Sequence, residues 1–429
     1  MRIAFYTLGC KVNQYETQAL EQLVTQRGHE VVPFEGEADC YIINTCTVTA
    51  VSDKKSRQVI RRARKSAPDA VIAVCGCYPQ THPGDMEDLS IDLVSGTGDR
   101  LGFVELLEQT CAQRKPITSL DNAMERRVFE VLPAGGLEGR TRAMLKVEDG
   151  CVNFCTYCII PFARGPVRSL PLAEAVKQTK ELAALGYREL VLTGIEISSW
   201  GREFRDGTSL IDLIEAVCRA APECRFRLGS LEPRTITAEF CQRAARLDNL
   251  CPHFHLSMQS GCSTVLKRMN RRYDADRFYE SVRLLREYLD EPGVTTDLIV
   301  GFPGETEEEF QETLAFIRKC AFSAMHIFPY SKRPGTPAAK MPDQILNAVK
   351  EERAHRAAAV AAEMEREYLE KFLNRTVPVL FEEEREGHWR GYTTRYTEVW
   401  VESSENLHNA VRNVEIHTVD GGALRGTLA

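Results

Sequence analysis

The chain has 429 residues, 43% of them hydrophobic and 27% charged, which is typical of a globular protein of two or three domains. Its 15 cysteines argue against a small disulfide-stabilised secreted domain, and its net charge of −7 against a uniformly basic nucleic-acid binder. The chain shows no apolar run of membrane length and no N-terminal secretory pattern, so we expect a cytoplasmic protein with no membrane partner.

The first third of the chain alternates short apolar runs with helical patterns. The expected strands and helices, in chain order, cover residues 2–9, 16–26, 39–45, 52–66 and 70–76. Strands separated by helices pair in parallel, so residues 1–115 are expected to form a doubly wound parallel sheet. The polar stretch 116–136, which ends at Gly135-Gly136, is expected to be a linker.

Six further strand patterns follow, with helical patterns between successive members. These strands are expected over residues 142–148, 189–194, 225–230, 253–258, 294–302 and 323–328. Six such units predict a partial (β/α)6 barrel of the TIM type, which we assign to residues 137–372 together with the charged, alanine-rich helix after Pro342. Residues 373–429 change to short alternating runs, which predict a small separate β-barrel.

Three cysteines stand directly after the first barrel strand: Cys151, Cys155 and Cys158. They fall in a loop at the edge where barrel enzymes build their active sites. Three thiolates can hold three irons of a [4Fe–4S] cluster and leave the fourth iron open to a small ligand. A zinc site completed by a histidine is the alternative, but no nearby residue offers a fourth ligand at zinc spacing.

Three more cysteines each follow one of the first three strands: Cys10, Cys46 and Cys77. The ends of parallel strands line one edge of a sheet, so widely spaced residues can converge there. A second [4Fe–4S] cluster with one free iron is therefore predicted, and three unrelated small residues are the alternative. Cys75 lies inside the apolar third strand and is expected to be a core residue.

The pattern Cys-x3-Cys-x2-Cys, with an aromatic residue before the last cysteine, resembles the radical S-adenosylmethionine (SAM) enzymes. The resemblance implies that the open iron binds the amino and carboxylate groups of SAM, and that one electron cleaves SAM to a 5′-deoxyadenosyl radical. Residues at successive strand ends resemble the cofactor loops of that family. The implied SAM-binding residues are Tyr157, Thr193, Gly194, Glu196, Ser230, Glu232, Ser257, Gln259 and Gly301.

Two cluster sites followed by a small β domain resemble the methylthiotransferases over nearly the whole chain, with the last domain TRAM-like. Cys77 rather than Cys75 matches the family position. "TLGCKVNQYET", "IIPFARG", "LSMQSG" and "FPYSKRPGTPA" are most similar to the branch that modifies N6-threonylcarbamoyladenosine beside the tRNA anticodon. The resemblance implies two SAM molecules. One methylates a sulfur at the N-terminal cluster, and the other gives the radical that removes hydrogen from C2 of the adenine, to which the methylthio group is then transferred.

Three alternatives stay open. The substrate could be a ribosomal protein side chain or isopentenyladenosine in tRNA, or the chain could be a non-catalytic iron–sulfur protein that binds RNA. The N-terminal motif and the cofactor loops favour threonylcarbamoyladenosine, and the intact cysteine motif disfavours a non-catalytic protein. The implied partners are the anticodon stem-loop of tRNA and an electron donor such as flavodoxin or ferredoxin, and no DNA partner is expected.

A basic helix follows Cys46 and suits a phosphate backbone, although a solvated charged face is the alternative. The expected RNA contacts are Lys54, Lys55, Arg61, Arg62, Arg168, Arg271, Tyr392 and Arg395. The segment 375–429 carries six arginines, no lysine and nine acidic residues, so a β domain that packs on the barrel is the alternative there. Two positions depart from the family, which commonly has Arg at Pro166 and Asn at Arg395.

Overall fold

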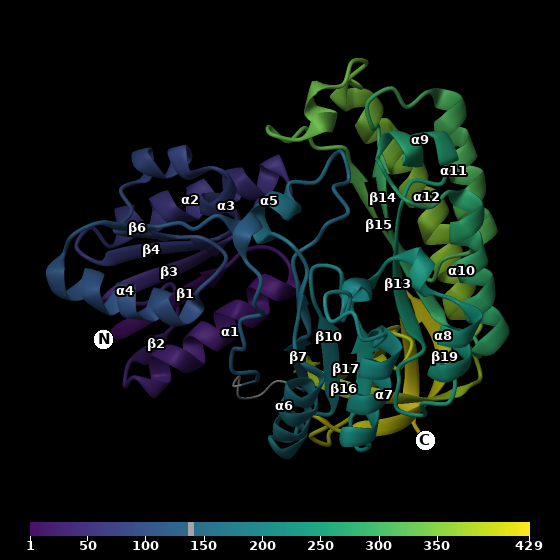
Figure 1. The fold of residues 1–429 in the computed structure, drawn as a ribbon. Helices are drawn as coiled ribbons and strands as arrows, with labels where there is room; N and C mark the ends of the chain where they lie inside the picture. The colour runs from purple at the N-terminus through teal and green to yellow at the C-terminus, as the bar shows by residue number, and fades with distance from the viewer. Residues whose placement is uncertain (136–140) are drawn as a thin grey trace.

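The computed structural model describes residues 1–135 and 141–429, and the chain forms three units in sequence order (Figure 1). They are a six-stranded parallel α/β unit, an open barrel of parallel strands and a closed five-stranded barrel. The boundary expected between linker and barrel, at residues 136 and 137, lies outside the described residues. Within the described ranges, every helix is too short or too polar to span a bilayer.

The N-terminal sheet has the strand order β2-β1-β3-β4-β5-β6, and all of its pairs are parallel. Its elements are β1 (Arg2–Thr7), α1 (Lys11–Gln26), β2 (Glu30–Val32), β3 (Cys40–Thr45), α2 (Ala50–Ser66), β4 (Val71–Gly76), α3 (Cys77–Thr81), β5 (Leu93–Ser95), α4 (Arg100–Gln113) and β6 (Ile117–Ser119). Helices cover both faces of the sheet, so β3 and β4 are buried along their full length. This confirms the expected doubly wound sheet. Strand β6 falls inside the stretch expected to be linker, yet it pairs with β5.

The barrel has six strand positions, but hydrogen bonding divides them into two sheets, β11-β10-β7 and β12-β13-β14-β15. The strands are β7 (Arg142–Lys146), β10 (Glu189–Thr193), β11 (Arg225–Leu228), β12 (Ser230–Leu231), β13 (His253–Gln259), β14 (Gly293–Val300) and β15 (Ala324–Pro329). The third expected strand breaks at Gly229, where a Cβ would lie 2.8 Å from the carbonyl oxygen of Leu192. The predicted (β/α)6 partial barrel is confirmed.

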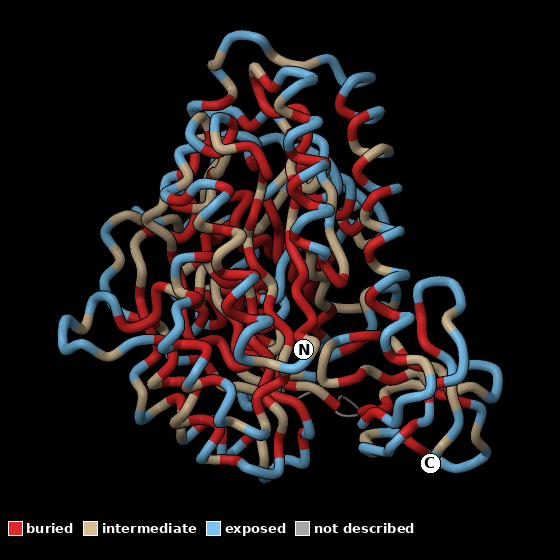
Figure 2. The backbone as a smooth tube through the Cα atoms, turned by 90° about the vertical axis from the view of Figure 1, so that its right-hand side faces the viewer, coloured by how far each residue is buried: buried red, intermediate tan, exposed pale blue. Residues whose placement is uncertain are grey.

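Helices cover the outside of the barrel strands, which explains why alternate strand residues are apolar. The covering helices are α6 (Leu172–Ala184), α7 (Leu210–Ala220), α8 (Ala238–Ala244), α10 (Ala275–Tyr288), α11 (Glu307–Cys320) and α12 (Asn347–Glu370). Leu145, Leu192 and Phe226 are fully buried against this layer, each worth about 1.5–3 kcal/mol of burial. Buried positions concentrate in the middle of the molecule and exposed ones at its periphery (Figure 2).

The barrel does not close, because β7 and β15 are both edge strands, and the N-terminal unit attaches to both edges. Near β7, Lys146 Nζ lies 2.9 Å from Glu16 of α1. Near β15, Arg333 pairs with Asp53 of α2 at 2.5 Å. In addition, α5 (Ile160–Arg164), beside the barrel cysteines, packs against α3. The N-terminal unit therefore bridges the open side of the barrel (Figure 1).

The C-terminal unit is a closed barrel in the order β16-β17-β18-β20-β19, which confirms the expected small β-barrel. Its strands are β16 (Thr376–Arg385), β17 (His388–Thr393), β18 (Glu398–Glu402), β19 (Val411–Asp420) and β20 (Ala423–Leu428). It docks on residues where the larger barrel's strands begin: Arg225 Nη2 donates to the Tyr392 carbonyl at 3.0 Å, and Arg395 Nε donates to the Glu291 carbonyl at 2.9 Å. This end is opposite the barrel cysteines.

Candidate active site

The structure brings Cys10, Cys46 and Cys77 together at the C-terminal edge of the N-terminal sheet. Two glycines show how closely their loops pack. Gly9 has φ +105°, and a Cβ there would lie 2.8 Å from Cys46 Sγ. Gly76 has φ +103°, and a Cβ there would lie 2.5 Å from a carbonyl oxygen at the end of β3. Only glycine tolerates these positions, so the sequence places it beside each loop.

The three thiols form a donor set that is open on one side, since Cys10 is exposed whereas Cys46 and Cys77 are buried. Burial raises the pKa of Cys77 to about 12, against the nearby Arg164 charge, so a thiolate there needs a bound cation. Cys75 is fully buried in the sheet core, as its apolar strand predicted. Across the described chain, no three His, Cys, Asp or Glu side chains surround a single-ion position, and the fit to a [4Fe–4S] cluster rests on thiol chemistry.

The barrel cysteines lie on a loop that backbone hydrogen bonds hold in place. The Cys151 N–H donates to the Gly165 carbonyl at 3.0 Å, and the Asn270 side chain donates to the Phe154 carbonyl at 3.0 Å. Burial raises the pKa of Cys158 to about 12. As in the N-terminal set, three neighbouring thiols, with no fourth protein ligand among the described residues, fit a cluster with one open iron.

Two buried carboxyl groups stand beside this loop, and each keeps one oxygen without a partner. Glu148 Oε2 accepts the Glu196 N–H at 2.7 Å, and Glu196 Oε2 accepts the Ser199 hydroxyl, while Glu148 Oε1 and Glu196 Oε1 have no partner among the described residues. Burial raises the pKa of Glu196 to about 7 and that of Glu148 well above its usual range. Two unpartnered acceptors next to a cluster loop suit a donor such as the SAM amino group. Glu148 was not predicted from the sequence, because it lies in the two-residue strand β8 (Glu148–Asp149), which shows no periodic pattern.

The other residues expected to bind SAM lie along the same edge. Thr193 is buried at the end of β10, and a Cβ at Gly194 would lie 2.8 Å from Glu148 Oε2. The hydroxyl groups of Ser230 and Ser257 form a hydrogen bond, with 2.8 Å between the two Oγ atoms. They lie on neighbouring strands, β12 and β13, as the order of the strand-end motifs predicted.

Three more of the residues expected to bind the cofactor lie near the barrel cysteines and are held by protein contacts or by local backbone structure. The Glu232 N–H donates to Ser198 Oγ at 2.9 Å. Gln259 has φ +70°, a strained conformation for a non-glycine residue, where the pairing of β13 with β14 shifts register. The Tyr157 ring packs against Phe302 with ring centroids 6.5 Å apart.

Gly301 also has φ +70°, but its small size serves packing. A Cβ there would lie 2.4 Å from Lys350 Cγ of α12, and its N–H donates to Glu305 Oε1 at 2.8 Å. The closest group to this glycine is thus a protein side chain rather than an open cofactor pocket.

The residues expected to contact RNA divide into two sets. Lys54, Lys55, Arg61 and Arg62 are exposed on α2, the helix that follows the Cys46 loop, and the Arg62 guanidinium lies over the rings of Tyr6 and Phe34, 5.8 and 5.6 Å from their centroids. Arg168 is instead buried and donates to the carbonyls of Arg164 and Pro166 at 2.9 and 2.7 Å, so its predicted RNA contact is corrected. The sequence pattern could not reveal this, because an arginine two residues after a proline gives no sign of its hydrogen-bond partners.

Arg271, Tyr392 and Arg395 are likewise engaged by protein. Arg271 Nη1 lies 3.3 Å from Cys155 Sγ and its Nη2 donates to the Ser257 carbonyl at 2.9 Å, so it belongs to the barrel cysteine loop. The Arg142 guanidinium carbon lies over the Tyr392 ring, 4.6 Å from the ring centroid. Arg395 holds the docking contact with the Glu291 carbonyl, and its RNA contact stays a prediction.

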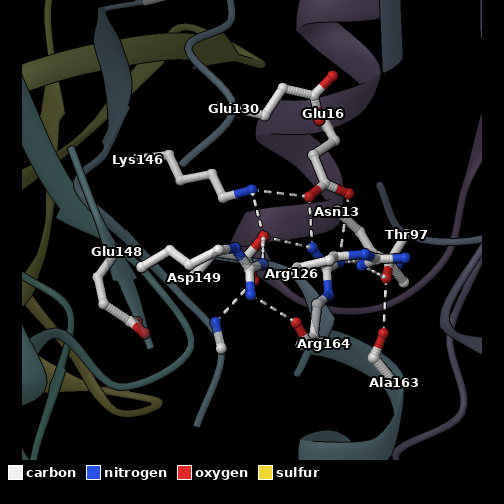
Figure 3. Close-up of polar contacts among 12 residues, drawn as sticks. Asn13, Glu16, Thr97, Arg126, Glu130, Lys146, Glu148, Asp149, Ala163 and Arg164 are labelled. Atoms are coloured by element: carbon white, nitrogen blue, oxygen red, sulfur yellow. Dashed lines mark hydrogen bonds and ion pairs between the residues drawn. The ribbon is translucent and has the colours of Figure 1, made fainter. Parts of the chain in front are cut away.

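A buried ion network links the two cysteine sites (Figure 3). Glu16 of α1 accepts from Arg100 and Lys146, each at 2.9 Å, and pairs with Arg164. Burial alone would raise the pKa of Glu16, but these three cations hold it well below its usual range. Lys146 also bonds Asp149 at 2.8 Å, two residues before Cys151. The network therefore fixes α1, which follows Cys10, against the strand that leads to Cys151.

Comparison with known proteins follows this division of the chain. Residues 2–96 match the uncharacterized protein family UPF0004, and residues 145–317 match the radical SAM superfamily. The threonylcarbamoyladenosine tRNA methylthiotransferase MtaB of Bacillus subtilis (strain 168) is 45% identical over 96% of this chain and 93% of its own. The enzyme of the same name from Aquifex aeolicus (strain VF5) is 37% identical over 96% and 99%.

Among solved structures, the fold is similar to that of the radical S-adenosylmethionine methyltransferase TsrM from Kitasatospora setae. The TM-score is 0.57 at 16% identity, over 79% of this chain and 73% of that one. A likeness at this identity concerns the fold alone.

Proposed function

The chain belongs to the radical SAM methylthiotransferases that act on threonylcarbamoyladenosine in tRNA, and from this membership we propose how its residues divide the reaction. The enzyme is a transferase that converts N6-threonylcarbamoyladenosine in tRNA to its 2-methylthio derivative with SAM and [4Fe–4S] clusters. A ribosomal protein or isopentenyladenosine as substrate is not favoured, because the relatives at 45% and 37% identity carry the threonylcarbamoyladenosine name.

The barrel cysteines would hold the cluster that binds SAM, and the N-terminal cysteines would hold the second cluster. When bound, the first cluster and SAM supply one-electron chemistry able to remove hydrogen from C2 of adenine, and the second supplies the sulfur site. The observation that carries this division is the convergence of Cys10, Cys46 and Cys77 at a sheet edge that the Glu16 network ties to the barrel loop.

Residues around the barrel cysteines would position SAM. Glu148 and Glu196 each offer an unpartnered carboxyl oxygen to its amino group. Arg271, bonded to Cys155, would hold the cysteine loop and place a positive charge beside the SAM carboxylate. Thr193 and Ser257 would line the cofactor from neighbouring strand ends.

The anticodon stem-loop would lie along α2. Its exposed Lys54 and Lys55 stand in the part of the helix that follows the Cys46 loop, where phosphates would place a base near both clusters, and Arg61 and Arg62 would extend the contact along the helix. The target base must leave its stack to enter between the two units. A reduced flavodoxin or ferredoxin would supply the electron, and the cytoplasm is the proposed location.

The three functional domains would follow the three structural units. We assign residues 1–115 to the N-terminal cluster domain, 137–372 to the radical SAM barrel and 373–429 to the TRAM-like domain. Because β6 belongs to the first sheet, the linker within 116–136 would begin after Ser119.

The test is mass spectrometry of digested tRNA nucleosides from cells with and without this gene. The methylthio form of N6-threonylcarbamoyladenosine should disappear in the deletion strain and return with the wild-type gene. Persistence of that nucleoside in a strain with no second such gene would contradict the assignment.

A further inference from the structure

A cavity of about 480 Å³ lies where α1, the first barrel strands and the C-terminal barrel meet. None of the roles assigned to the cysteine sites involves it. Its lining includes Lys11 and Gln14 from α1, Arg142 and Arg227 from β7 and β11, and Tyr396 from the C-terminal barrel. Its volume is in the range of pockets that hold small molecules.

The lining of the cavity favours an anion, since four of its side chains are basic and two are acidic. Each lining arginine already has a carboxylate partner: Glu382 for Arg142, Glu189 for Arg227 and Glu383 for Arg390. Lys11 differs. Its side chain is exposed and, within the described ranges, makes no hydrogen bond or ion pair, so it is the cation of the lining without a carboxylate at ion-pair distance.

The position of Lys11 joins the cavity to the reaction. Lys11 is the first residue of α1 and directly follows Cys10, so this wall of the cavity begins beside the N-terminal cysteine site. The opposite wall is aromatic: the Tyr396 ring stacks on Tyr392 with centroids 5.0 Å apart and packs on His253 at 5.1 Å. His253 is 5% exposed, and its Nδ1 has no partner in the described chain.

We propose that this cavity receives the threonyl end of the threonylcarbamoyl group and that Lys11 binds its carboxylate. The inference rests on the function proposed above. The carboxylate is the negative charge that distinguishes this modified base from an adenine with a hydrocarbon substituent. An ammonium without a partner gains a charge-assisted hydrogen bond from the first and is left unpaired by the second. Lys11 is therefore a specificity-determining residue.

The test compares two anticodon stem-loops on the holoenzyme with both clusters. One carries N6-threonylcarbamoyladenosine, and in the other its carboxylate is converted to the carboxamide. The wild-type enzyme should show a KM about 10- to 100-fold lower for the carboxylate RNA, the range of one charge-assisted hydrogen bond. Lys11→Gln should raise the KM of the carboxylate RNA to that of the carboxamide RNA, whereas Lys11→Arg should keep the preference.

The second variant is Gln14→Glu, which places a carboxylate in the same cavity and should also weaken only the carboxylate RNA. Lys180→Gln, an exposed lysine on α6, is the matched control and should change neither KM. Iron content and SAM cleavage are measured for every variant, and a Lys11 variant that loses iron leaves Gln14→Glu as the deciding one.

Three results would overturn the inference: a wild-type enzyme without preference between the RNAs, equal weakening of both RNAs by Lys11→Gln, or no effect of Gln14→Glu. Equal weakening would identify a phosphate contact instead. A wild-type enzyme that modifies neither RNA would contradict the proposed function itself, so the two failures are distinguishable.

Discussion

Single residues in this molecule show how charge is kept in a buried place. Glu16 is 1% exposed and faces three cations at once. Burying a charged group is costly unless the charge is paired. Removing the Glu16 carboxylate would leave Arg100, Lys146 and Arg164 buried without their shared partner, which would destabilise the fold. Neutralising that carboxylate is therefore the direct way to probe the network.

Glu16→Gln should lower the free energy of unfolding by about 3–5 kcal/mol, because it leaves buried cations unpaired. The matched control is Glu280→Gln, which breaks an exposed pair with Arg283 and should leave the urea midpoint nearly unchanged. Urea midpoints measure both. Equal midpoints for the two variants would show that the network does not hold the units together.

Glu196 predicts a pH dependence of stability. Its pKa is about 7 in the folded protein against 4.5 ordinarily, so the protonated carboxyl favours folding. That contribution is complete below pH 4.5 and is lost as the pH rises through about 7. Glu196→Gln stays neutral, and without SAM its stability relative to wild type should rise by about 2–3 kcal/mol between pH 5 and 8. A pH-independent difference between their urea midpoints would contradict this origin.

Among the secondary-structure elements, strand ends carry the site, and glycines allow those ends to approach. Gly76→Ala should strain the loop at Cys77, since φ is +103° and a Cβ would strike a backbone oxygen. We expect the free energy of unfolding to fall by about 1–3 kcal/mol. After reconstitution the variant should hold roughly half of the wild-type iron, because the barrel cluster is retained. Gly84→Ala is the control, because no atom lies within 4 Å of its added Cβ. Full iron content in both variants would refute the packing argument.

The same elements show how far the amino-acid sequence predicts the fold. Apolar runs of four or more residues identified β1, β3 and β4, and the rule that parallel strand ends share an edge placed the cysteines after them at one edge of the sheet, where the structure has them. Strands β2, β5 and β6 have three residues each, too few for a periodic pattern, and went unpredicted.

Residues whose role depends on unpaired atoms could not be found from the sequence. In the described part of the chain, Glu148 keeps one carboxyl oxygen without a partner and Lys11 makes no hydrogen bond or ion pair, which is a property of their spatial neighbours rather than of their position in the sequence. Arg168 and Arg395 illustrate the converse: both donate to protein carbonyl groups, and the sequence gives no sign of these hydrogen bonds.

In the molecule as a whole, the N-terminal unit spans the open side of the parallel barrel, and the exposed basic helix α2 lies at that junction. The triple variant Lys54→Ala, Lys55→Ala, Arg61→Ala should weaken tRNA binding. The slope of log affinity against log salt should become shallower by about 1 for each phosphate that is no longer neutralised. Arg395→Ala is the control: its hydrogen bonds are within the protein, so it should lower thermal stability without changing the slope. Unchanged slopes in both would move the RNA off α2.

The division of labour between the two cysteine sites is the central proposal: the N-terminal cysteines would hold the cluster that supplies the sulfur site, and the barrel cysteines would hold the cluster that cleaves SAM. The decisive experiment uses the Cys10→Ala, Cys46→Ala, Cys77→Ala enzyme, reduced and supplied with SAM and modified stem-loop RNA, with its products identified by mass spectrometry. We expect 5′-deoxyadenosine without any methylthio nucleoside. Methylthiolated RNA from this variant would contradict the division.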